Sequence, residues 1–123
     1  MGTEDVSEAL THRAPGPLLA LETLPPGAFV EAEAEVDGSA ESLVVHRDAA
    51  GHVRAWLNVC PHAGRRLDWA PGQFLLSKDG LLVCAVHGAS FETAGGTCVA
   101  GPCRGESLRA VAVEVRDGAV WLA

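Results

Sequence analysis

The sequence predicts an all-β domain, an antiparallel β-sandwich or small barrel, and three observations support this fold class. Apolar residues make up 48% of the 123-residue chain, which is enough for one globular domain with a single core. Seven prolines and fourteen glycines indicate many turns between short elements. Runs of branched apolar residues alternate with turn sequences, and no stretch has the periodicity of an amphipathic helix.

Two segments precede the first predicted hairpin. Residues 1–17 end in Arg-Ala-Pro-Gly-Pro and are expected to form a flexible lead-in, while residues 18–123 form the domain. Residues 18–36 predict a short strand, a Pro-Pro-Gly turn and a strand in which apolar and acidic residues alternate, and Asp37-Gly38 after them is a turn signal. The acidic side of this last strand is interpreted as a solvated face, which could also steer a basic partner protein.

Three hairpins follow along the chain. The runs Leu43–His46 and Val53–Val59 flank a turn and form the first. The second is centred on residues 78–80, which read Lys-Asp-Gly, and the third on Asp117 and Gly118. Successive strands joined by such short turns pair antiparallel, which leads to the sandwich or barrel.

The strand pattern predicts whether four aromatic or imidazole side chains are buried or exposed. Trp56 and Trp121 lie inside predicted strands and are expected in the core. His46 and His52 flank the first hairpin turn and are expected on the surface.

The charge and the cysteine content narrow the class of protein. A formal net charge of −7 disfavours nucleic acid and anionic membranes as partners and favours a basic protein surface. No apolar run approaches the length of a membrane span, and the start "MGTEDVSEAL" lacks the features of a secretory signal. Four cysteines without such a signal favour metal or redox chemistry over a disulfide framework, and the expected compartment is the cytoplasm.

Two short motifs place cysteine and histidine together. The stretch "VCPHAGRRLD" contains Cys-x-His, and "VCAVHGASFE" contains Cys-x-x-His. Each motif follows a run of apolar strand residues and is followed by glycine, so two loops at one end of a sandwich could converge on one metal centre. The residues are Cys60, His62 and Gly64 in the first loop and Cys84, His87 and Gly88 in the second.

Two thiolates and two imidazoles suit two kinds of centre. One zinc ion accepts such a set in a tetrahedron. A [2Fe-2S] cluster accepts two cysteines on one iron and two histidines on the other. Zinc sites more often pair like ligands in one loop, whereas here each loop contributes one of each kind, which favours the cluster and leaves zinc as the alternative.

On these motifs the sequence resembles Rieske [2Fe-2S] proteins, in particular the Rieske-type ferredoxins of ring-hydroxylating dioxygenase systems, from about residue 18 to the end. The resemblance implies antiparallel sheets with a cluster-binding subdomain of two loops at one tip. It also implies one [2Fe-2S] cluster, with support for its loops from Gly64, Gly88 and Pro102. The implied metal ligands are Cys60, His62, Cys84 and His87.

The chain departs from the cytochrome bc-type branch of this family at four positions. Where that branch carries a disulfide between the two loops, this chain has Arg65 and Val86, so the disulfide cannot form. Where it carries serine and tyrosine hydroxyls that donate to sulfur, this chain has Ala89 and Phe91. Since such hydrogen bonds stabilise the reduced cluster, their loss predicts a potential towards the bottom of the range of roughly −150 to +300 mV.

The resemblance implies a soluble one-electron carrier without catalytic residues, an electron-transfer component that is not itself an enzyme. Its expected partners are a flavin- or NAD(P)H-linked reductase and an oxygenase or other acceptor protein, and a carrier that visits both is expected to be a monomer. The alternatives are a small subunit of a larger oxidoreductase such as nitrite reductase, and a zinc-binding interaction module.

Two further groups have open interpretations. Cys98 and Cys103 form either a disulfide or redox-sensitive pair, or two reduced thiols that pack a loop, and the cytoplasmic compartment favours the second. Arg65, Arg66 and Trp69 follow the first motif and form either a docking edge or a solvated pair of arginines beside a packed tryptophan.

Overall fold

The structure is a computed structural model that describes residues 16–61, 64–85 and 88–123. Short and medium-length strands dominate these residues, with one 3-10 turn, η1 (Leu21–Thr23). The strands are β1 (Leu19–Ala20), β2 (Phe29–Val36), β3 (Ser39–Arg47), β4 (Val53–Leu57), β5 (Leu75–Leu76), β6 (Leu82–Val83), β7 (Ser90–Phe91), β8 (Cys98–Ala100), β9 (Ala110–Val111), β10 (Val113–Arg116) and β11 (Ala119–Leu122).

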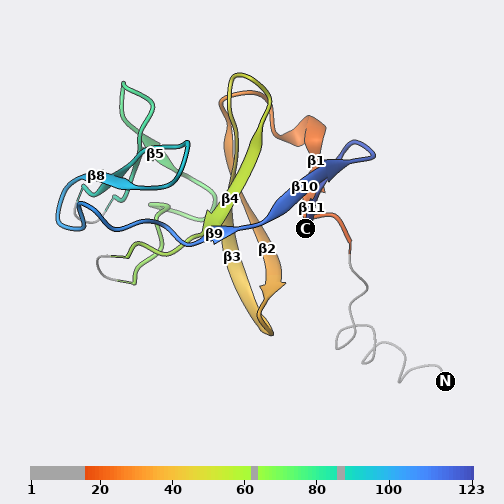
Figure 1. The fold of residues 1–123 in the computed structure, drawn as a ribbon, viewed down its shortest axis with the longest axis horizontal. Helices are drawn as coiled ribbons and strands as arrows, with labels where there is room; N and C mark the ends of the chain where they lie inside the picture. Colours follow the sequence, from red (N-terminus) through yellow and green to blue (C-terminus); the bar gives the residue numbers. More distant parts are fainter. Residues whose placement is uncertain (1–15, 62–63, 86–87) are drawn as a thin grey trace.

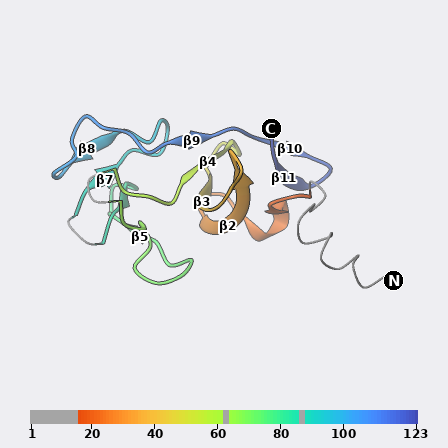
Figure 2. The ribbon, with the colours of Figure 1, turned by 90° about the horizontal axis from the view of Figure 1, so that it is seen from below.

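The strands form three sheets that follow one another through the molecule (Figure 1). The central sheet has the order β2-β3-β4-β9, the end sheet β1-β11-β10, and the loop sheet β5-β6-β7-β8. Figures 1 and 2 both show the central sheet between the other two. Every strand pair in these sheets is antiparallel, which confirms the predicted fold class.

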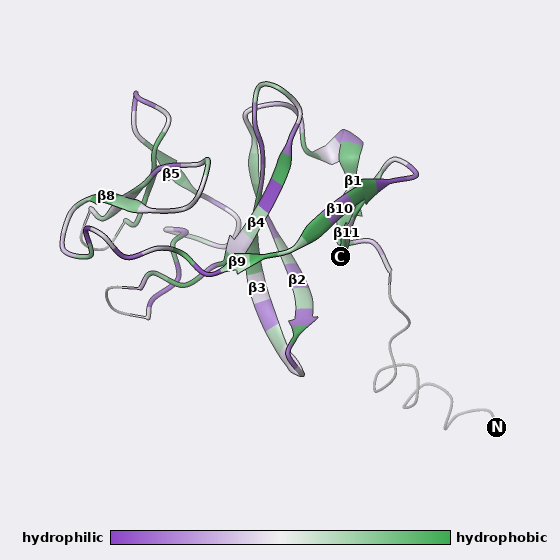
Figure 3. Ribbon diagram, viewed as in Figure 1, coloured by the Kyte–Doolittle hydropathy of each residue, from purple (hydrophilic) through white to green (hydrophobic). Residues whose placement is uncertain are grey.

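The predicted hairpin turns are present. Asp37 and Asp117 both have a φ of 53°, and each is followed by a glycine, with φ of 83° at Gly38 and 73° at Gly118. Two successive residues with positive φ give the turn twist that fits two-residue β-hairpins, and Asp-Gly is one of the pairs that favour it. These turns set the registers of β2 with β3 and of β10 with β11. Figure 3 shows hydrophilic residues at the β10–β11 turn and hydrophobic residues along β9 and at the start of β10.

Both faces of the central sheet are buried in its middle, where β3 and β4 lie between two apolar clusters. On β3, Leu43 and Val45 belong to the apolar cluster on the side of the end sheet, whereas Val44 belongs to the cluster on the side of the loop sheet. On β4, Ala55 and Trp56 divide between the two clusters in the same way. Side chains of a strand alternate between faces, so a strand covered on both sides is apolar without interruption. This accounts for the continuous apolar run in β3.

The surface position predicted for His46 is wrong. His46 is only 5% exposed, its ring stacks on Phe29 at 3.9 Å, and its Nδ1 lies 3.0 Å from the carbonyl oxygen of Ala28. The residue lies in the part of β3 that is covered on both sides, so its position in the strand decides its burial. His52 is exposed as predicted.

The two tryptophans differ, and the core position predicted for Trp121 is wrong. Trp56 is 2% exposed and lies in the core as predicted. Trp121 is only half-buried: its ring lies 3.9 Å from the Arg116 guanidinium, and its indole N–H donates to the carbonyl oxygen of Arg116. Trp121 therefore covers the end sheet from outside, where a cation can lie against its ring.

Two further sequence expectations concern the first part of the chain. On β2, Ala32 and Ala34 are buried while Glu33 and Glu35 are exposed, as predicted for a solvated acidic face, but the Glu31 side chain is only 17% exposed and pairs with Arg66. Residues 1–15, which make up most of the predicted lead-in, lie outside the described residues.

The described part of the chain contains no helix long and apolar enough to cross a membrane.

Burial of His46 predicts a pH-dependent stability. Desolvation lowers the pKa of His46 below its ordinary 6.5, against the opposing effect of the hydrogen bond to Ala28. Below about pH 6.5, His46 binds a proton in the unfolded chain but not in the folded chain. The free energy of unfolding therefore holds its full contribution from His46 above this pH and falls as the pH drops towards the folded pKa. Urea unfolding followed by circular dichroism, between about pH 8 and about pH 5.5, should show this loss.

The variant His46→Phe should lose less stability over the same pH interval, because it has no imidazole to protonate at this position. His52→Asn is the matched control and should keep the pH dependence of the wild type, since His52 is exposed. Equal slopes for the wild type and His46→Phe would contradict the assignment.

Candidate metal centre

The first cysteine loop begins where β4 leaves the central sheet. Cys60 lies three residues after the end of β4, and its side chain is 1% exposed. The Cys60 N–H donates to the carbonyl oxygen of Arg65 at 2.7 Å, and the Gly64 N–H donates to the carbonyl oxygen of Cys60 at 2.8 Å. The backbone thus closes on itself around the cysteine and directs the thiol into the interior.

The second cysteine loop repeats this closure. Cys84 directly follows β6 and is 2% exposed. Its N–H donates to the carbonyl oxygen of Ala89 at 2.7 Å, and the Gly88 N–H donates to the carbonyl oxygen of Cys84 at 2.9 Å. The two loops therefore have the same pair of hydrogen bonds at the same spacing, although their sequences between cysteine and glycine differ.

The glycine in each loop serves the backbone conformation. Gly64 has a φ of 68° and Gly88 a φ of 75°, a region that residues with a Cβ rarely adopt. A Cβ at either position would meet no atom within 4 Å, so space alone does not require glycine there. The two glycines are therefore needed for the positive φ of the turn that closes each loop.

Both thiols lie in one apolar cluster between the central sheet and the loop sheet. The cluster comprises Val44, Trp56, Cys60, Leu67, Leu82, Cys84, Ala89, Phe91, Cys98, Cys103 and Leu108. His62 and His87 lie outside the described residues, as does Val86. Within residues 16–61, 64–85 and 88–123, no three histidine, cysteine or carboxylate side chains gather as a metal-binding group.

A chain of hydrogen bonds attaches the first loop to the central sheet. Asn58, which is 1% exposed, accepts from the Leu67 N–H at 2.8 Å through its Oδ1 and donates to Ser42 Oγ at 3.1 Å. Ser42 in turn donates to Glu31 Oε2 at 2.6 Å. Asn58 thus joins the residues on both sides of Cys60, and the contact continues through β3 to β2.

Arg66 completes this network with two carboxylates. Its guanidinium donates to Asp68 at 2.7 and 2.9 Å and to Glu31 at 2.8 Å. Burial opposes ionisation of Asp68, but hydrogen bonds from Arg66 and the Gly72 N–H outweigh it and lower the pKa of Asp68. Hydrogen bonds from Ser42 and Arg66 lower the pKa of Glu31, so both carboxylates are anionic at neutral pH.

A glycine turn supports the second loop. Gly101 has a φ of 97°, and a Cβ on it would lie 2.7 Å from the Cα of Ala89. The chain after β8 therefore lies directly against the backbone that closes the Cys84 loop, and only glycine fits this approach. Pro102 follows Gly101 in this turn and is exposed.

The two residues that replace the serine and tyrosine of the cytochrome bc-type branch, Ala89 and Phe91, are in the core. Ala89 and Phe91 are both fully buried in the cluster that contains the two thiols. Ser90, which lies between them, donates its hydroxyl to the carbonyl oxygen of Gly88 at 3.1 Å. The hydroxyl in this segment is thus engaged by the backbone.

The segment after the first loop separates into buried and exposed parts. Leu67 is fully buried, whereas Trp69 is 62% exposed and Arg65 is exposed. Of the two interpretations of this segment, the packed tryptophan is wrong, because Trp69 points away from the core. Arg66 is partly exposed but paired with carboxylates, so it is more than a solvated charge.

Cys98 and Cys103 approach each other in the same cluster. Each is 1% exposed, and the Cys103 thiol donates to Cys98 Sγ at 2.9 Å as two separate thiols. Burial, together with the hydrogen bond to Cys98, raises the pKa of Cys103 to about 12. Cys103 is therefore a neutral thiol in this state, and both side chains pack in the core, as favoured by the sequence.

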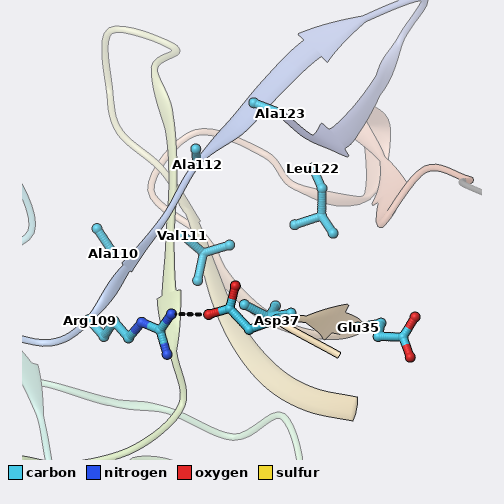
Figure 4. Close-up of a pocket in the computed structure, with 9 residues that line it drawn as sticks. Glu35, Asp37, Arg109, Ala110, Val111, Ala112, Leu122 and Ala123 are labelled. Atoms are coloured by element: carbon cyan, nitrogen blue, oxygen red, sulfur yellow. Dashed lines mark hydrogen bonds and ion pairs between the residues drawn. The ribbon is translucent and has the colours of Figure 1, made fainter. Parts of the chain in front are cut away.

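A surface hollow lies away from the two loops. A cavity of about 300 Å³ separates the end of the β2–β3 hairpin from the segment around β9 (Figure 4). Arg109, the cation among its lining residues, forms an ion pair with Asp37 across the opening. The lining of the hollow includes no cysteine or histidine.

Comparisons with known proteins identify the family. A family model of the Rieske [2Fe-2S] domain matches residues 16–115. The chain belongs to the Rieske [2Fe-2S] domain family. A comparison with curated protein sequences finds no match.

Solved structures of Rieske proteins share the fold. A chain of the reduced complex between oxygenase and ferredoxin in carbazole 1,9a-dioxygenase aligns with a TM-score of 0.69 and 18% identity, over 87% of this chain and 27% of that chain. The terminal oxygenase of carbazole 1,9a-dioxygenase from Nocardioides aromaticivorans IC177 gives 0.65 and 24%, over 86% and 29%. The quaternary ammonium Rieske monooxygenase CntA, in complex with an inhibitor, gives 0.65 and 24%, over 97% and 34%. The chain spans about a third or less of the length of these proteins, and the likeness concerns the fold.

Membership of the Rieske family implies a [2Fe-2S] cluster, and the described residues fit one. Cys60 and Cys84 supply two buried sulfur atoms from two equivalent loops, and thiolates are the ligands that such clusters require. Both loops are closed by their own hydrogen bonds, so the thiols have fixed backbones. Two buried cysteines on equivalently closed loops are the residue type that such a cluster would need on its sulfur side.

Sequence reasoning missed the network that holds the first loop. Asn58 stands two residues before Cys60. The signal that the sequence offered was a polar amide side chain within the apolar run that leads into this loop. The pairing of Arg66 with Glu31 joins residues 35 positions apart, and nothing in the local sequence marks it.

Replacing Asn58 should loosen this attachment. In Asn58→Leu the buried Leu67 N–H loses its acceptor, and an unsatisfied buried donor costs about 1–3 kcal/mol. Asn58→Gln keeps a neutral amide oxygen that can accept and should lose less of the free energy of unfolding in urea. If both variants unfold at the wild-type urea concentration, Asn58 does not hold the loop.

Proposed function

We propose that the protein is a one-electron carrier that uses a Rieske [2Fe-2S] cluster and passes electrons from a reductase to an oxygenase-type acceptor. The observation that supports this proposal most is the pair of equivalent loops, each of which closes around a buried cysteine. When bound, the cluster accepts and releases single electrons.

In this proposal Cys60 and Cys84 would hold one iron, and His62 and His87 would hold the other. The cysteines enter the shared core, so the sulfur side of the centre is shielded from water. Gly64 and Gly88 set the backbone of the two loops, and the turn with Gly101 and Pro102 supports the second loop from outside. Domain boundaries at residues 18 and 123, a monomer and a cytoplasmic location remain predictions.

A low reduction potential follows from the groups around the thiols. Ala89 and Phe91 present no hydroxyl to the sulfur atoms, and Ser90 donates to the backbone. Fewer donors to sulfur leave the reduced state less stabilised, so the potential lies low in the Rieske range. A carrier of this kind suits electrons from a flavin- or NAD(P)H-linked reductase.

An oxygenase-type acceptor is supported by the proteins that share the fold. One similar structure is a complex of an oxygenase with a ferredoxin, both of carbazole 1,9a-dioxygenase. A second candidate rests on length: the similar chains are about three times longer, so this domain could deliver electrons inside a larger oxygenase. Transfer from the separate, reduced protein to an added oxygenase supports the carrier, and its failure with every oxygenase tested favours the second candidate.

Introducing a hydroxyl at Phe91 should raise the potential. Phe91→Tyr adds a donor inside the cluster of residues around the thiols, and the expected rise is tens of millivolts within a range of roughly −150 to +300 mV. A redox titration followed by visible absorbance measures it. Phe91→Leu is the control for altered packing and should leave the potential near the wild-type value. A wild-type potential near the top of the range would contradict the role assigned to Ala89 and Phe91.

The ligand assignment is tested by His87→Cys together with the metal content. The wild type should be red-brown, contain two irons for each chain and show a Rieske visible and EPR spectrum. The variant should lose this spectrum or change it to that of a different cluster type, because a thiolate replaces a neutral ligand. His52→Asn should leave it unchanged. A colourless protein that contains zinc would support the interaction module instead, and an unchanged spectrum in His87→Cys would remove His87 from the ligands.

A further inference from the structure

We propose that Cys98 and Cys103 are the site of a reversible disulfide, formed by exchange with a low-molecular-weight disulfide, and that this bond fixes the turn that supports the Cys84 loop. Neither cysteine has a role in the proposed electron transfer. The two residues lie on β8 and in the turn after it, five positions apart, and both side chains point into the same core.

The backbone holds the two sulfur atoms together. The Cys98 N–H donates to the carbonyl oxygen of Glu106 at 2.7 Å, the Gly105 N–H donates to that of Cys98 at 3.0 Å, and the Glu106 N–H donates to that of Cys103 at 2.9 Å. The chain thus folds back on itself between the cysteines. Their sulfur atoms lie 2.9 Å apart and need to approach by only about a further 0.9 Å to reach a disulfide bond length.

The turn between the two cysteines also gives the small disulfide access to them. Gly101, Pro102, Arg104 and Gly105 are all exposed, although the cysteines beside them are buried. Opening of this turn exposes the thiols without disturbing the central sheet. Closed, the pair is protected, so the exchange is slow and follows the opening of the turn.

The chemistry is two successive thiol–disulfide exchanges. One cysteine thiol loses its proton, attacks a sulfur of the small disulfide, forms a mixed disulfide and releases one small thiol. The other cysteine then attacks the protein sulfur of that mixed disulfide, and the second small thiol leaves. The two cysteines are oxidised by two electrons, and the small disulfide is reduced to two thiols, which take up the two protons.

The bond acts on the Cys84 loop through Gly101. Gly101 lies between the two cysteines and in direct contact with Ala89, and the carbonyl oxygen of Ala89 accepts the hydrogen bond of the Cys84 N–H. A disulfide restricts the conformations of the short segment that it closes. The oxidised protein therefore holds the backbone around Cys84 more firmly than the reduced one.

Labelling of thiols tests the bond itself and does not depend on the proposed function. The complete protein is equilibrated with glutathione at increasing ratios of disulfide to thiol, denatured in acid, labelled with N-ethylmaleimide and digested with trypsin. Residues 79–104 form one peptide that contains Cys84, Cys98 and Cys103, and residues 55–65 form another that contains Cys60. Oxidation should reduce the labels on the first peptide from three to one, with fragmentation locating the bond between Cys98 and Cys103, and dithiothreitol should restore three.

The peptide with Cys60 is the internal control and should always carry one label. Cys98→Ser and Cys103→Ser should each keep two labels on the longer peptide at every ratio. Three labels on the wild-type peptide under all conditions, a stable glutathione adduct, or a bond that involves Cys84 would each overturn the proposal. These results are read from the wild type, so they decide it even if a variant fails to fold.

The effect on the Cys84 loop is measured separately and rests on the proposed function. Loss of visible absorbance in the presence of an iron chelator should be severalfold slower in the oxidised protein than in the reduced one. Cys103→Ser should show one rate at every glutathione ratio. A disulfide that forms without slowing this loss would overturn the link to the Cys84 loop, while a protein without visible absorbance would count against the proposed function alone.

Discussion

The burial of two cysteine side chains in one apolar cluster is the constraint on which the rest of the structure depends. A loop that directs its side chain inward has to satisfy its own backbone hydrogen bonds, because the core offers no water to do so. Both loops meet this requirement in the same way, with one bond from the cysteine N–H and one to its carbonyl oxygen. Glycine at the fourth position after each cysteine permits the left-handed conformation that the closure requires.

The two loops are held by different means. The first is attached to the central sheet by the amide of Asn58 and by the contacts of Arg66 with Asp68 and Glu31. The second is supported by the close approach of Gly101 to the backbone of Ala89. A polar attachment fixes direction through hydrogen-bond geometry, whereas close packing fixes distance.

Electrostatics and packing also separate the two cysteine pairs. Cys60 and Cys84 belong to loops at strand ends, from which a thiolate can reach a metal centre that we propose between them. Cys98 and Cys103 face each other within a turn, and burial raises the pKa of Cys103 to about 12. The same apolar cluster thus surrounds both pairs, and the position of each pair on the backbone decides which chemistry it can take part in.

The sequence by itself determined the all-β class, the Asp-Gly hairpins and the paired loops, because these depend on local conformation and on the alternation of side chains along a strand. Only the tertiary structure decided the burial of His46, the exposure of Trp69 and the ion pair between Arg66 and Glu31. The burial of a strand residue depends on which sheet covers its face, and an ion pair across 35 positions depends on the path of the whole chain. The neighbouring residues in the sequence determine neither feature, because both arise when separate strands pack together.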